Sequence, residues 1–554
     1  MNNVPIFRFV SPRSGLYFGT VGSSGVGAFA SSLLLRGSSR SYASKIKVSR
    51  KLTLSPTVSK QSLKSEKSRS GSGSGSRSKG RSSYGSVRRG RGSQSAKLNN
   101  FLPSGSTSVT TTLGSGKFSV LYELDRKSRE SHRNVLSKVD SFEALKIESS
   151  VRDSIMETVL GHLEIIKPTP IQTLAVKAIQ GRRKNPLEQH TWLLAAETGS
   201  GKTLAYLAPL LSKLKVEEEE PGWELIKELP GPRAVILVPS AELIAQVDSV
   251  IKKIKSTVPL SSVACLPGVS TRYIHSRLAK GIDILICTPD KLAQLSKNSN
   301  LAKIQYLQRC KMLVIDEADS LMNDSFRDAT LGSIGFMPNL LDLVFCTATI
   351  PRQFDRILRE KYPDTTRLVT PKIHKLPGHI DFRVVEVFRP PYMDNKMLAL
   401  KQALFAIYHD GSEDGLTKRV IVFVNRKESV SPLVTELNTS GFISIGIDGT
   451  VKPTERKQLI EDFISPAKTI EESGGQKLKV LVTTDLMARG VDTNRVRNII
   501  LYDLPLSSAD LLHRAGRTGR LGARGRVLLL VNKKESQSWV KGLEKAVRKG
   551  LALA

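Results

Sequence analysis

The sequence predicts two tandem α/β domains, each built on a parallel β-sheet, preceded by a disordered basic segment. The chain has 554 residues, more than one ordinary domain needs, and 40% of them are hydrophobic, enough for at least one large core. From about residue 130, short apolar runs alternate with longer helical patterns, and the alternation restarts at residue 420. Strands buried on both faces that alternate with helices are typical of parallel sheets.

The beginning of the chain has the composition of a mitochondrial transit peptide. Its first 45 residues contain no Asp or Glu, and an acid-free start rich in Arg and Ser is typical of organelle targeting. The run Arg40–Ser44 resembles a mitochondrial processing site with cleavage after Tyr42. We therefore expect a transit peptide over residues 1–42 and a location in the mitochondrial matrix, with an ordinary disordered tail as the alternative.

Residues 43–130 are expected to be disordered because this Ser/Gly/Arg/Lys-rich segment has too little apolar surface to offset its chain entropy. Residues 1–100 contain 19 Lys and Arg against one acidic residue, Glu66, in a chain whose net charge is +33. Such an excess of positive charge indicates a polyanionic partner, either nucleic acid or an anionic membrane surface. The segment is interpreted as a phosphate-binding arm or as a plain linker.

Neither membrane insertion nor a cysteine-based site is expected. The longest apolar stretch near the start covers only residues 26–35, whereas a transmembrane helix needs about 20 apolar residues. The four cysteines have no CxxC spacing, so buried thiols are expected rather than a zinc site or a disulfide framework. They are Cys265, Cys287, Cys310 and Cys346.

The two domains are expected over residues 131–372 and 378–554, with a join rich in proline and lysine at Thr370–Pro377. Strands of the first are expected at Trp192–Ala196, Ala234–Val238, Ile282–Cys287, Met312–Ile315 and Leu343–Cys346, with helices at Leu204–Leu214 and Glu242–Ile254. Strands of the second are expected at Val420–Val424, Ile443–Ile447, Lys479–Val482, Val496–Tyr502 and Val527–Val531, with helices at Met397–Tyr408 and Glu455–Phe463.

The strongest local signal is a phosphate-binding loop, AETGSGKT, between a predicted strand and a predicted helix. Gly199 and Gly201 let the backbone curl so that its N–H groups face phosphate oxygens, and the helix start adds positive charge. Lys202 can reach the terminal phosphates of ATP, and Thr203 can place its hydroxyl on Mg²⁺. The expected nucleotide-binding residues are Ala196, Glu197, Thr198, Gly199, Ser200, Gly201, Lys202 and Thr203.

A second signal is the run Asp316–Asp319, with the sequence DEAD, at the end of a predicted buried strand. Carboxylates there are costly unless a cation or hydrogen-bond donors satisfy them. Asp316 suits the coordination shell of Mg²⁺. Glu317 suits positioning and deprotonating the attacking water. Asp319 is expected to bond to a neighbouring motif.

With these motifs the chain resembles the DEAD-box RNA helicases over roughly residues 135–535, and the resemblance implies two RecA-like domains. The run KPTPIQ resembles the family's Q motif, in which Gln172 reads the adenine edge and an upstream aromatic, here Phe142, stacks on the base. The run Thr347–Thr349 matches the motif that couples ATP hydrolysis to strand separation, with Thr in place of the usual first Ser.

The second domain carries the family's remaining motifs. By resemblance, Thr484 approaches RNA phosphate and Asp492 approaches the ATP ribose. In the run HRAGRTGR, Arg517 and Arg520 correspond to arginine fingers that neutralise charge on the γ-phosphate. The catalytic set implied is Lys202, Asp316, Glu317, Arg517 and Arg520, and the coupling set is Asp319, Thr347, Thr349 and His513.

The motifs expected to face RNA resemble the family's less closely than those expected to face ATP. Ala241 stands where the family usually has Arg, Asp290–Lys291 where it has Gly-Arg, and Asp448 and Pro453 where it has His and Gln. Each change removes a donor or places a carboxylate near phosphate, which indicates a specialised grip on RNA. The expected RNA contacts are Pro239, Glu242, Gly268, Thr288, Pro289, Asn425, Gly449 and Thr484.

The expected function is that of an ATP-dependent RNA helicase with ATP and Mg²⁺ as cofactors. The resemblance to fungal mitochondrial DEAD-box helicases implies assembly of the large mitochondrial ribosomal subunit, by a monomer that associates with pre-ribosomal particles and acts on mitochondrial rRNA or ribonucleoprotein. Two alternatives stay open: an ATP-gated RNA clamp with little unwinding, and a mitochondrial intron-splicing or RNA-decay helicase. A DNA helicase is disfavoured because the motif set is that of RNA helicases.

Overall fold

A computed structural model describes most of the chain between Arg126 and Leu553. The predicted transit peptide and most of the predicted basic segment lie outside the described residues, and helix α1 begins at Arg126, inside that segment. No helix in the described part is both long and apolar enough to cross a lipid bilayer. The described residues are 126–181, 185, 187–297, 305–413, 415–465, 469–472, 477–485, 493, 496–519, 523–536 and 538–553.

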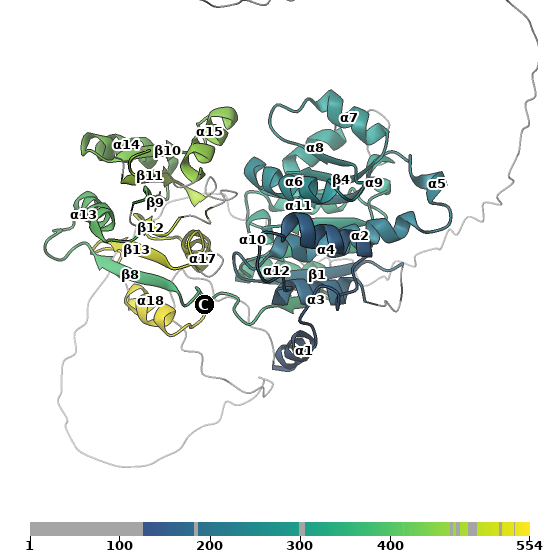
Figure 1. Ribbon diagram of the computed structural model, residues 1–554, viewed down its shortest axis with the longest axis horizontal. Coiled ribbons are helices and arrows are strands. Elements are labelled where there is room, and N and C mark those ends of the chain that lie inside the picture. The colour runs from purple at the N-terminus through teal and green to yellow at the C-terminus, as the bar shows by residue number, and fades with distance from the viewer. Residues whose placement is uncertain are drawn as a thin grey trace, which may run out of the picture. The chain divides into compact units, whose positions relative to one another are not determined.

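Seven parallel strands form the sheet of the first lobe, which we define as residues 126–369 (Figure 1). Their order across the sheet is β3-β4-β2-β5-β6-β1-β7. The central strands β2, β5 and β6 are buried along their whole length, which explains the apolar run that each contains. The strands are β1 His190–Ala195, β2 Pro232–Leu237, β3 Ser262–Ala264, β4 Ile282–Cys287, β5 Met312–Asp316, β6 Asp342–Thr347 and β7 Thr366–Val369.

Helices cover both faces of this sheet, because successive residues of each strand point to opposite sides. In β2, Ala234 and Ile236 belong to a core shared with α3, α4 and α6, whereas Val235 and Leu237 belong to a core shared with α7, α8 and α12. The helices are α1 Arg126–Leu136, α2 Ser149–Ser154, the π-helix η1 Ile155–Val159, α3 Pro170–Ile179, α4 Lys202–Glu218, α5 Trp223–Ile226, α6 Ala241–Lys255, α7 Thr271–Ala279, α8 Pro289–Lys297, α9 Gln305–Gln308, α10 Ala318–Leu321, α11 Arg327–Ile334 and α12 Arg352–Lys361.

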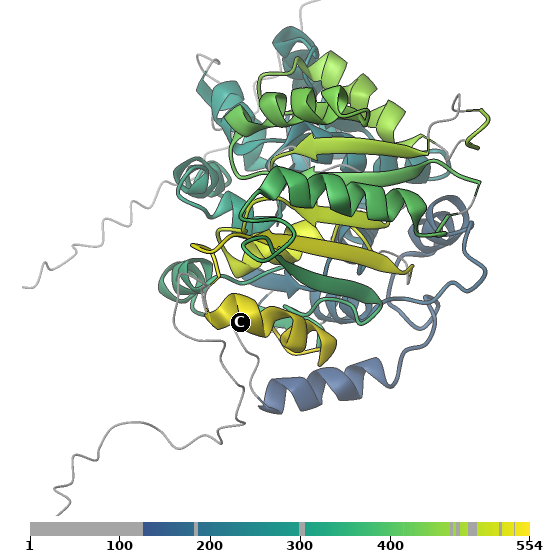
Figure 2. The ribbon, with the colours of Figure 1, turned by 90° about the vertical axis from the view of Figure 1, so that its left-hand side faces the viewer.

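The second lobe, residues 380–553, repeats this architecture with six parallel strands in the order β10-β11-β9-β12-β13-β8. One face of the sheet packs against α13 and α14, and the other against α15, α17 and α18 (Figure 2). The elements are β8 Ile380–Glu386, α13 Lys396–His409, β9 Lys418–Phe423, the 3₁₀ helix η2 Lys427–Ser429, α14 Val430–Thr439, β10 Ile443–Ile447, α15 Pro453–Ile464, β11 Leu478–Thr483, β12 Asn498–Leu501, α17 Ser508–Ala515, β13 Gly525–Val531 and α18 Ser538–Arg548.

The predicted fold class is confirmed: each lobe is an α/β layer structure with a parallel sheet. All ten predicted strands are present, but β3, β7 and β8 were not predicted from the sequence. β3 has only three residues, and β7 begins at the exposed Thr366. β8 alternates apolar residues with Asp381 and Arg383, because it lies at the sheet edge and exposes one side of its chain.

The order of the strands brings three predicted motifs of the first lobe together. In the parallel register, Ala195 of β1 pairs with Thr347 of β6, and Cys346 of β6 pairs with Asp316 of β5. The carboxyl ends of these neighbouring strands therefore lie at one edge of the sheet, where ligands bind in open α/β folds. The loops that follow them carry the phosphate-binding, DEAD and Thr-Ala-Thr motifs.

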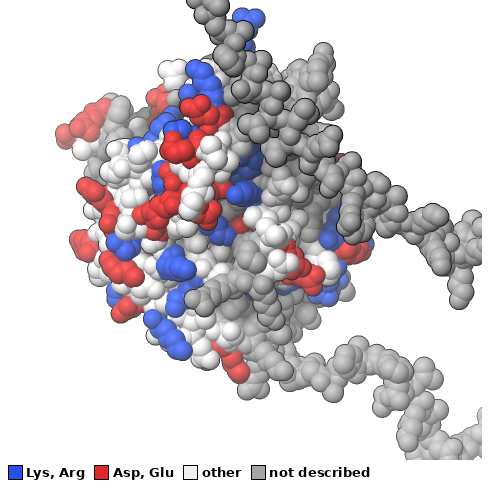
Figure 3. All heavy atoms as spheres, turned by 90° about the vertical axis from the view of Figure 1, so that its right-hand side faces the viewer, with Lys and Arg blue, Asp and Glu red and all other residues white. Residues whose placement is uncertain are grey.

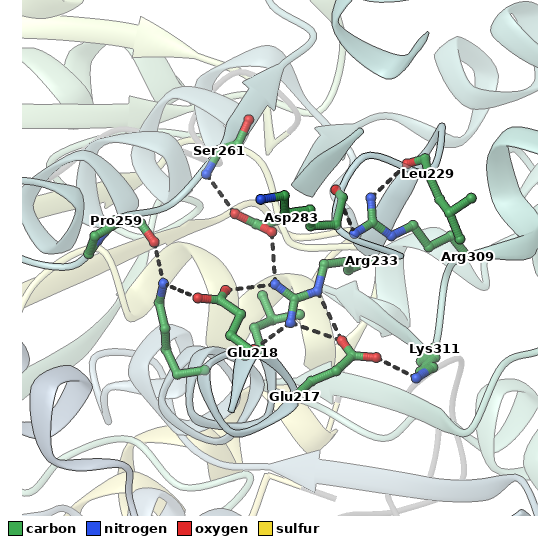
Figure 4. A network of polar contacts seen from close by, with 12 residues as sticks. Glu217, Glu218, Leu229, Arg233, Pro259, Ser261, Asp283, Arg309 and Lys311 are labelled. Atoms are coloured by element: carbon green, nitrogen blue, oxygen red, sulfur yellow. Dashed lines mark hydrogen bonds and ion pairs between the residues drawn. The ribbon is translucent and has the colours of Figure 1, made fainter. Parts of the chain in front are cut away.

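At the opposite edge of the sheet, a buried guanidinium ties the amino ends of the strands to α4 (Figure 4). Arg233, at the start of β2, is 2% exposed. Its Nη1 lies 2.8 Å from Glu218 and 2.9 Å from Asp283, and its Nε donates to Glu217 at 3.0 Å. The guanidinium also stacks over Trp223, 4.4 Å from the ring centroid. One guanidinium thus bridges three carboxylates that belong to α4 and β4, and Lys215 and Lys311 supply further positive charge to Glu218 and Glu217.

Replacing Arg233 with Ala should destabilise the chain by about 3–5 kcal/mol, because breaking a buried ion pair leaves charges without compensation. Chemical denaturation of the first lobe measures this change. Lys227→Ala is the control, since Lys227 pairs with Glu224 at an exposed surface and its removal should leave the midpoint unchanged. Equal midpoints for Arg233→Ala and the wild type would show that the network does not support the fold.

Candidate functional site

The phosphate-binding loop joins β1 to α4, and two glycines in the left-handed region shape it. Gly199 has φ of 78° and Gly201 has φ of 80°, values that strain any residue with a side chain. Gln172, buried on α3, donates from Nε2 to the carbonyl of Gly201 at 3.3 Å and accepts the N–H of Thr169 at 2.8 Å. A Cβ at position 201 would lie 2.5 Å from that Nε2, so a side chain there would displace Gln172 as well as strain the left-handed backbone.

Polar groups suited to an anion converge on this loop. Lys202 begins α4, and its Nζ donates to the carbonyls of Ala196 and Glu197, both at 3.2 Å. The hydroxyl of Ser200 is buried and has no hydrogen-bond partner in the described part of the chain. Thr203 follows Lys202 on α4 and is half-buried. A helix start, a cation and an unpaired hydroxyl together fit the phosphates of a nucleotide.

Asp316 ends β5 beside this loop and is 7% exposed. It accepts hydrogen bonds from the Tyr206 hydroxyl and the Glu317 N–H, both at 2.9 Å. Burial raises the pKa of Asp316 to about 6, and the charge of Glu317 adds to the effect while Lys202 opposes it. A buried carboxylate held next to a phosphate site in this way fits a divalent cation, which would stabilise its charged form.

Glu317 is held in a strained conformation at the start of α10. Its φ of 50° lies in the left-handed region, which costs a non-glycine residue of the order of 1 kcal/mol and is common at functional sites. Its Oε2 is buried and has no partner among the described residues. Glu317, Asp319 and His513 offer ligand atoms within 4.8 Å of one another. However, Asp319 and His513 are already bonded to each other, so Asp316 is the better cation ligand.

Asp319 connects the two lobes. Its Oδ2 accepts a hydrogen bond from the Thr349 hydroxyl of the first lobe and lies 2.8 Å from Nε2 of His513, on α17 of the second lobe. The side chains of Asp319 and His513 are 4% and 5% exposed. Thr347 fixes the neighbouring loop, because its hydroxyl donates to the carbonyl of Thr349 at 2.7 Å. All four residues predicted to couple the lobes therefore form one connected group.

The second lobe also touches the phosphate-binding loop directly. A Cβ built on Gly516 would lie 2.2 Å from the hydroxyl of Thr198, so only glycine allows this approach. Arg517 is buried, and its Nε donates to the carbonyl of His513 at 3.1 Å. The other two predicted nucleotide contacts from this lobe, Asp492 and Arg520, lie outside the described residues.

Among the predicted RNA contacts of the first lobe, Pro239 and Pro289 are buried, whereas Gly268 is exposed with φ of 87°. The hydroxyl of Thr288 accepts the N–H of Lys291 and so caps α8. The carboxylate of Glu242 is paired with Arg456 of the second lobe at 3.0 Å. The predicted residues therefore follow neighbouring strands at one rim of the lobe, and the side chains of Thr288 and Glu242 are engaged within the protein.

The predicted RNA contacts of the second lobe follow the carboxyl ends of three adjacent strands: Asn425 follows β9, Gly449 follows β10 and Thr484 follows β11. Gly449 is exposed and Thr484 is half-buried. The amide of Asn425 is used inside the lobe, because it accepts from Arg514 at 2.7 Å and donates to the carbonyl of Leu504 at 3.0 Å.

One expectation about the adenine site is wrong. Phe142 was expected to stack on the base, but its side chain is 2% exposed and belongs to the hydrophobic core of the first lobe. A ring enclosed in this way offers no face to a ligand. The position of an aromatic residue in the sequence could not reveal this, since a core phenylalanine and a stacking phenylalanine have the same apolar character.

Known protein families match most of the described chain. Residues 169–357 match the DEAD/DEAH box helicase family, and residues 395–522 match the helicase conserved C-terminal domain. The chain is 37% identical over 481 residues to the Candida glabrata protein named ATP-dependent RNA helicase MRH4, mitochondrial, covering 79% of this chain and 84% of that protein. The Saccharomyces cerevisiae protein of the same name is 36% identical over 486 residues, covering 78% and 86%.

Solved structures share the fold. Mss116p bound to single-stranded RNA and AMP-PNP has a TM-score of 0.59 at 22% identity, covering 76% of this chain and 79% of that one. Saccharomyces cerevisiae Dbp5 bound to RNA and ADP BeF3 has a TM-score of 0.55 at 22% identity, covering 75% and 94%. At this level of identity the likeness supports the two-lobed α/β architecture alone.

Three buried residues at the site were not predicted. Tyr206 lies one helical turn after Lys202, where a polar residue on an apolar helix face is the signal that could have identified it. Arg514 pairs with Asp485 at 2.6 Å. It lies in the run HRAGRTGR, where roles were predicted only for His513, Arg517 and Arg520. His374, in the connection between the lobes, had no signal: its Nε2 accepts the N–H of Ile350 at 3.1 Å, directly after Thr349.

The stability of the chain should depend on pH through His374. Burial lowers the pKa of His374 to about 4 from an ordinary value of 6.5, and the charge of Asp319 opposes this shift. Between pH 4 and pH 6.5 the unfolded chain therefore binds more protons than the folded chain. The contribution of neutral His374 to the free energy of unfolding is complete above pH 6.5 and is lost as the pH falls towards 4. Between pH 7 and pH 5 the free energy of unfolding of the wild type should therefore fall by about 2 kcal/mol more than that of His374→Gln.

Urea unfolding of both chains at the two pH values measures this difference. His162→Gln is the matched control, because His162 is exposed and its replacement should leave the pH dependence of the wild type intact. An identical pH dependence for the wild type and His374→Gln would contradict the assignment of a buried neutral imidazole.

Proposed function

Because the chain belongs to the DEAD-box family of ATP-dependent RNA helicases, we propose that it remodels mitochondrial RNA or ribonucleoprotein in assembly of the large mitochondrial ribosomal subunit. The main support for ATP-driven remodelling is that residues of both lobes contact the same predicted nucleotide site. Gly516 of the second lobe lies against Thr198 of the phosphate-binding loop, and His513 bonds to Asp319 of the DEAD motif. A nucleotide held there would be in reach of residues from both lobes.

In this proposal the first lobe binds ATP with Mg²⁺. Lys202 and the backbone from Ala196 to Thr203 hold the phosphates, and Gln172 reads the adenine edge while it stabilises the loop. Thr203 and Asp316 are the protein ligands of Mg²⁺. Bound ATP supplies the γ-phosphoryl group, and Glu317 orients the attacking water and accepts its proton through the carboxylate oxygen that has no protein partner.

The second lobe supplies charge stabilisation and the link to RNA. Arg517 and Arg520 neutralise charge on the γ-phosphoryl group. Asp492 holds the ribose. Asp319 keeps its bond from Thr349 within the first lobe and gains the bond to His513 when the lobes approach, so that closure completes the group next to the catalytic Glu317. Opening of the lobes after hydrolysis resets the cycle.

RNA is proposed to lie across the rims of both lobes, on the residues at the ends of their strands. Phosphate and sugar contacts carry no sequence information, so the choice of RNA comes from elsewhere. Two side chains at the proposed track are already occupied, since Glu242 pairs with Arg456 and the Asn425 amide is bonded within its lobe. These contacts support a specialised grip, and they keep the ATP-gated clamp as a second candidate function.

The proposed location is the mitochondrial matrix. Relatives that align with 78–79% of the chain are named mitochondrial, and the acid-free N-terminal sequence agrees with a transit peptide. The assembly of the large ribosomal subunit, a monomeric state and the association with pre-ribosomal particles rest on the resemblance to the fungal mitochondrial helicases.

Replacing Lys202 with Ala should lower ATP turnover by on the order of 100-fold or more, because the terminal phosphates lose their charge partner. RNA-stimulated phosphate release by the purified chain measures this loss. Lys177→Ala is the control, since Lys177 is exposed on α3, away from the loop, and its turnover should match the wild type. Undiminished turnover by Lys202→Ala would falsify the assignment of the phosphate site.

A chain with Glu317→Gln, introduced into mitochondria depleted of the natural protein, should fail to support assembly of the large ribosomal subunit. It can hold ATP but lacks the base that activates water, so precursors of the large subunit should accumulate in sucrose gradients. Glu219→Gln, at an exposed position at the end of α4, should restore assembly.

Restoration of assembly by Glu317→Gln would establish the clamp instead of the ATPase. Normal large-subunit assembly after depletion of the protein itself would refute the ribosomal role. In that case, defects confined to intron splicing or RNA decay would identify the alternative target.

A further inference from the structure

The last helix, α18, has two chemically distinct faces. Trp539, Val540, Leu543, Ala546 and Val547 are buried in the core of the second lobe, where the helix packs against the edge strand β8. This packing occupies the whole apolar face of the helix. The other face is directed to solvent along the outside of the lobe (Figure 2).

The solvent face of α18 is a row of cations. Lys541 and Lys545 lie about 6 Å apart along one side of the helix, and Lys549 continues the four-residue interval in the turn that follows, where its N–H bonds to the carbonyl of Lys545. Arg548 extends the row on the same side. All four side chains are exposed, and none pairs with a carboxylate anywhere in the described part of the chain. We call these four residues the α18 stripe.

The only carboxylate on this helix, Glu544, borders the stripe but bonds to the backbone of the lobe. Oε1 of Glu544 accepts the N–H of Val384 at 2.9 Å, which satisfies a backbone donor of the edge strand β8. The stripe therefore has a single sign of charge. The face of the molecule shown in Figure 3 is different, because acidic and basic side chains are mixed there.

We propose that the α18 stripe binds the phosphate backbone of RNA as a second contact surface, separate from the strand-end track. This rests on the proposed function, which supplies RNA as the polyanion. Four exposed, unpaired cations in a row suit the regularly spaced phosphates of a nucleic acid. An anionic membrane is the less suitable occupant, because an interfacial helix inserts an apolar face and the apolar face of α18 is already buried.

The stripe and the proposed track lie at different places on the second lobe. The track follows β9, β10 and β11, whereas α18 covers β8, and the sheet order separates β8 from the nearest of these strands, β9, by three strand spacings. At about 4.8 Å per spacing this separation is roughly 14 Å. A short single strand that fills the track therefore leaves the stripe free, and only an RNA with an adjoining duplex or further strand can contact both.

The test compares the full-length wild type with a variant in which Lys541, Lys545, Arg548 and Lys549 are all replaced by Gln, a residue that keeps helix propensity. Binding is measured from low to moderate salt with two probes: a short single-stranded RNA, and the same strand joined to a stem-loop. With the extended probe, the slope of log affinity against log salt should be shallower in the variant by about 3, since about four phosphate contacts are lost. With the short probe, the two slopes should agree.

The control removes four other exposed lysines that are scattered over the first lobe: Lys253→Gln, Lys255→Gln, Lys280→Gln and Lys361→Gln. It changes the net charge equally, so its slope should stay at that of the wild type if clustering on α18 is what binds RNA. ATP turnover at saturating short RNA should be unchanged in the stripe variant. ATP turnover distinguishes a failure of the proposed function from a failure of the stripe. Absence of RNA-stimulated turnover in the wild type would refute the proposed helicase function and would not bear on the stripe.

Equal slopes for the stripe variant and the control on the extended probe would overturn the inference. Loss of binding to phosphatidylcholine vesicles that contain phosphatidylserine, with RNA slopes unchanged, would assign the stripe to a membrane surface and would overturn it as well. Unfolding midpoints of all three chains verify that the substitutions leave the fold intact.

Discussion

The contact on which the arrangement of the site depends is the bond between the Asp319 carboxylate and His513. Asp319 is 4% exposed at the boundary between two lobes, and a buried carboxylate is stable only where donors surround it. Its donors come from both sides, from Thr349 in the first lobe and from the second lobe's α17. Any movement that separates the lobes breaks the bond to His513, and in the proposed function this bond links the nucleotide site to the position of the second lobe.

The parallel arrangement of the strands explains why the motifs of the first lobe lie close to Asp319. The carboxyl ends of β1, β5 and β6 are neighbours, so the phosphate-binding loop, Asp316 and Thr347 share one edge. At the amino ends of the strands, Arg233 and its three carboxylates stabilise the lobe. Strained or unpaired groups are found instead at the carboxyl ends. The left-handed Glu317 and the close approach of Gly516 to Thr198 are features of that kind.

The sequence predicted the parts of the structure that have a periodic or local cause. Buried strands such as Leu343–Cys346 were predicted because their sequences are continuously apolar, and the glycine-rich loop because its residue types are required at each place. The edge strand β8, the core position of Phe142 and the bond of His374 to Ile350 depend on tertiary neighbours that no local pattern encodes. The pairing of Glu242 with Arg456 joins residues more than 200 positions apart and could only be seen in the folded chain.

The central claim is that ATP binding and RNA binding are coupled through Asp319 and His513. A double-mutant cycle tests it most directly, using the factor by which a non-hydrolysable ATP analogue tightens RNA binding in the wild type, in Asp319→Asn, in His513→Ala and in the double variant. The proposed coupling predicts that either single change removes most of this factor and that the double variant is no worse than the singles. A factor that survives either change, or losses that simply add, would contradict it.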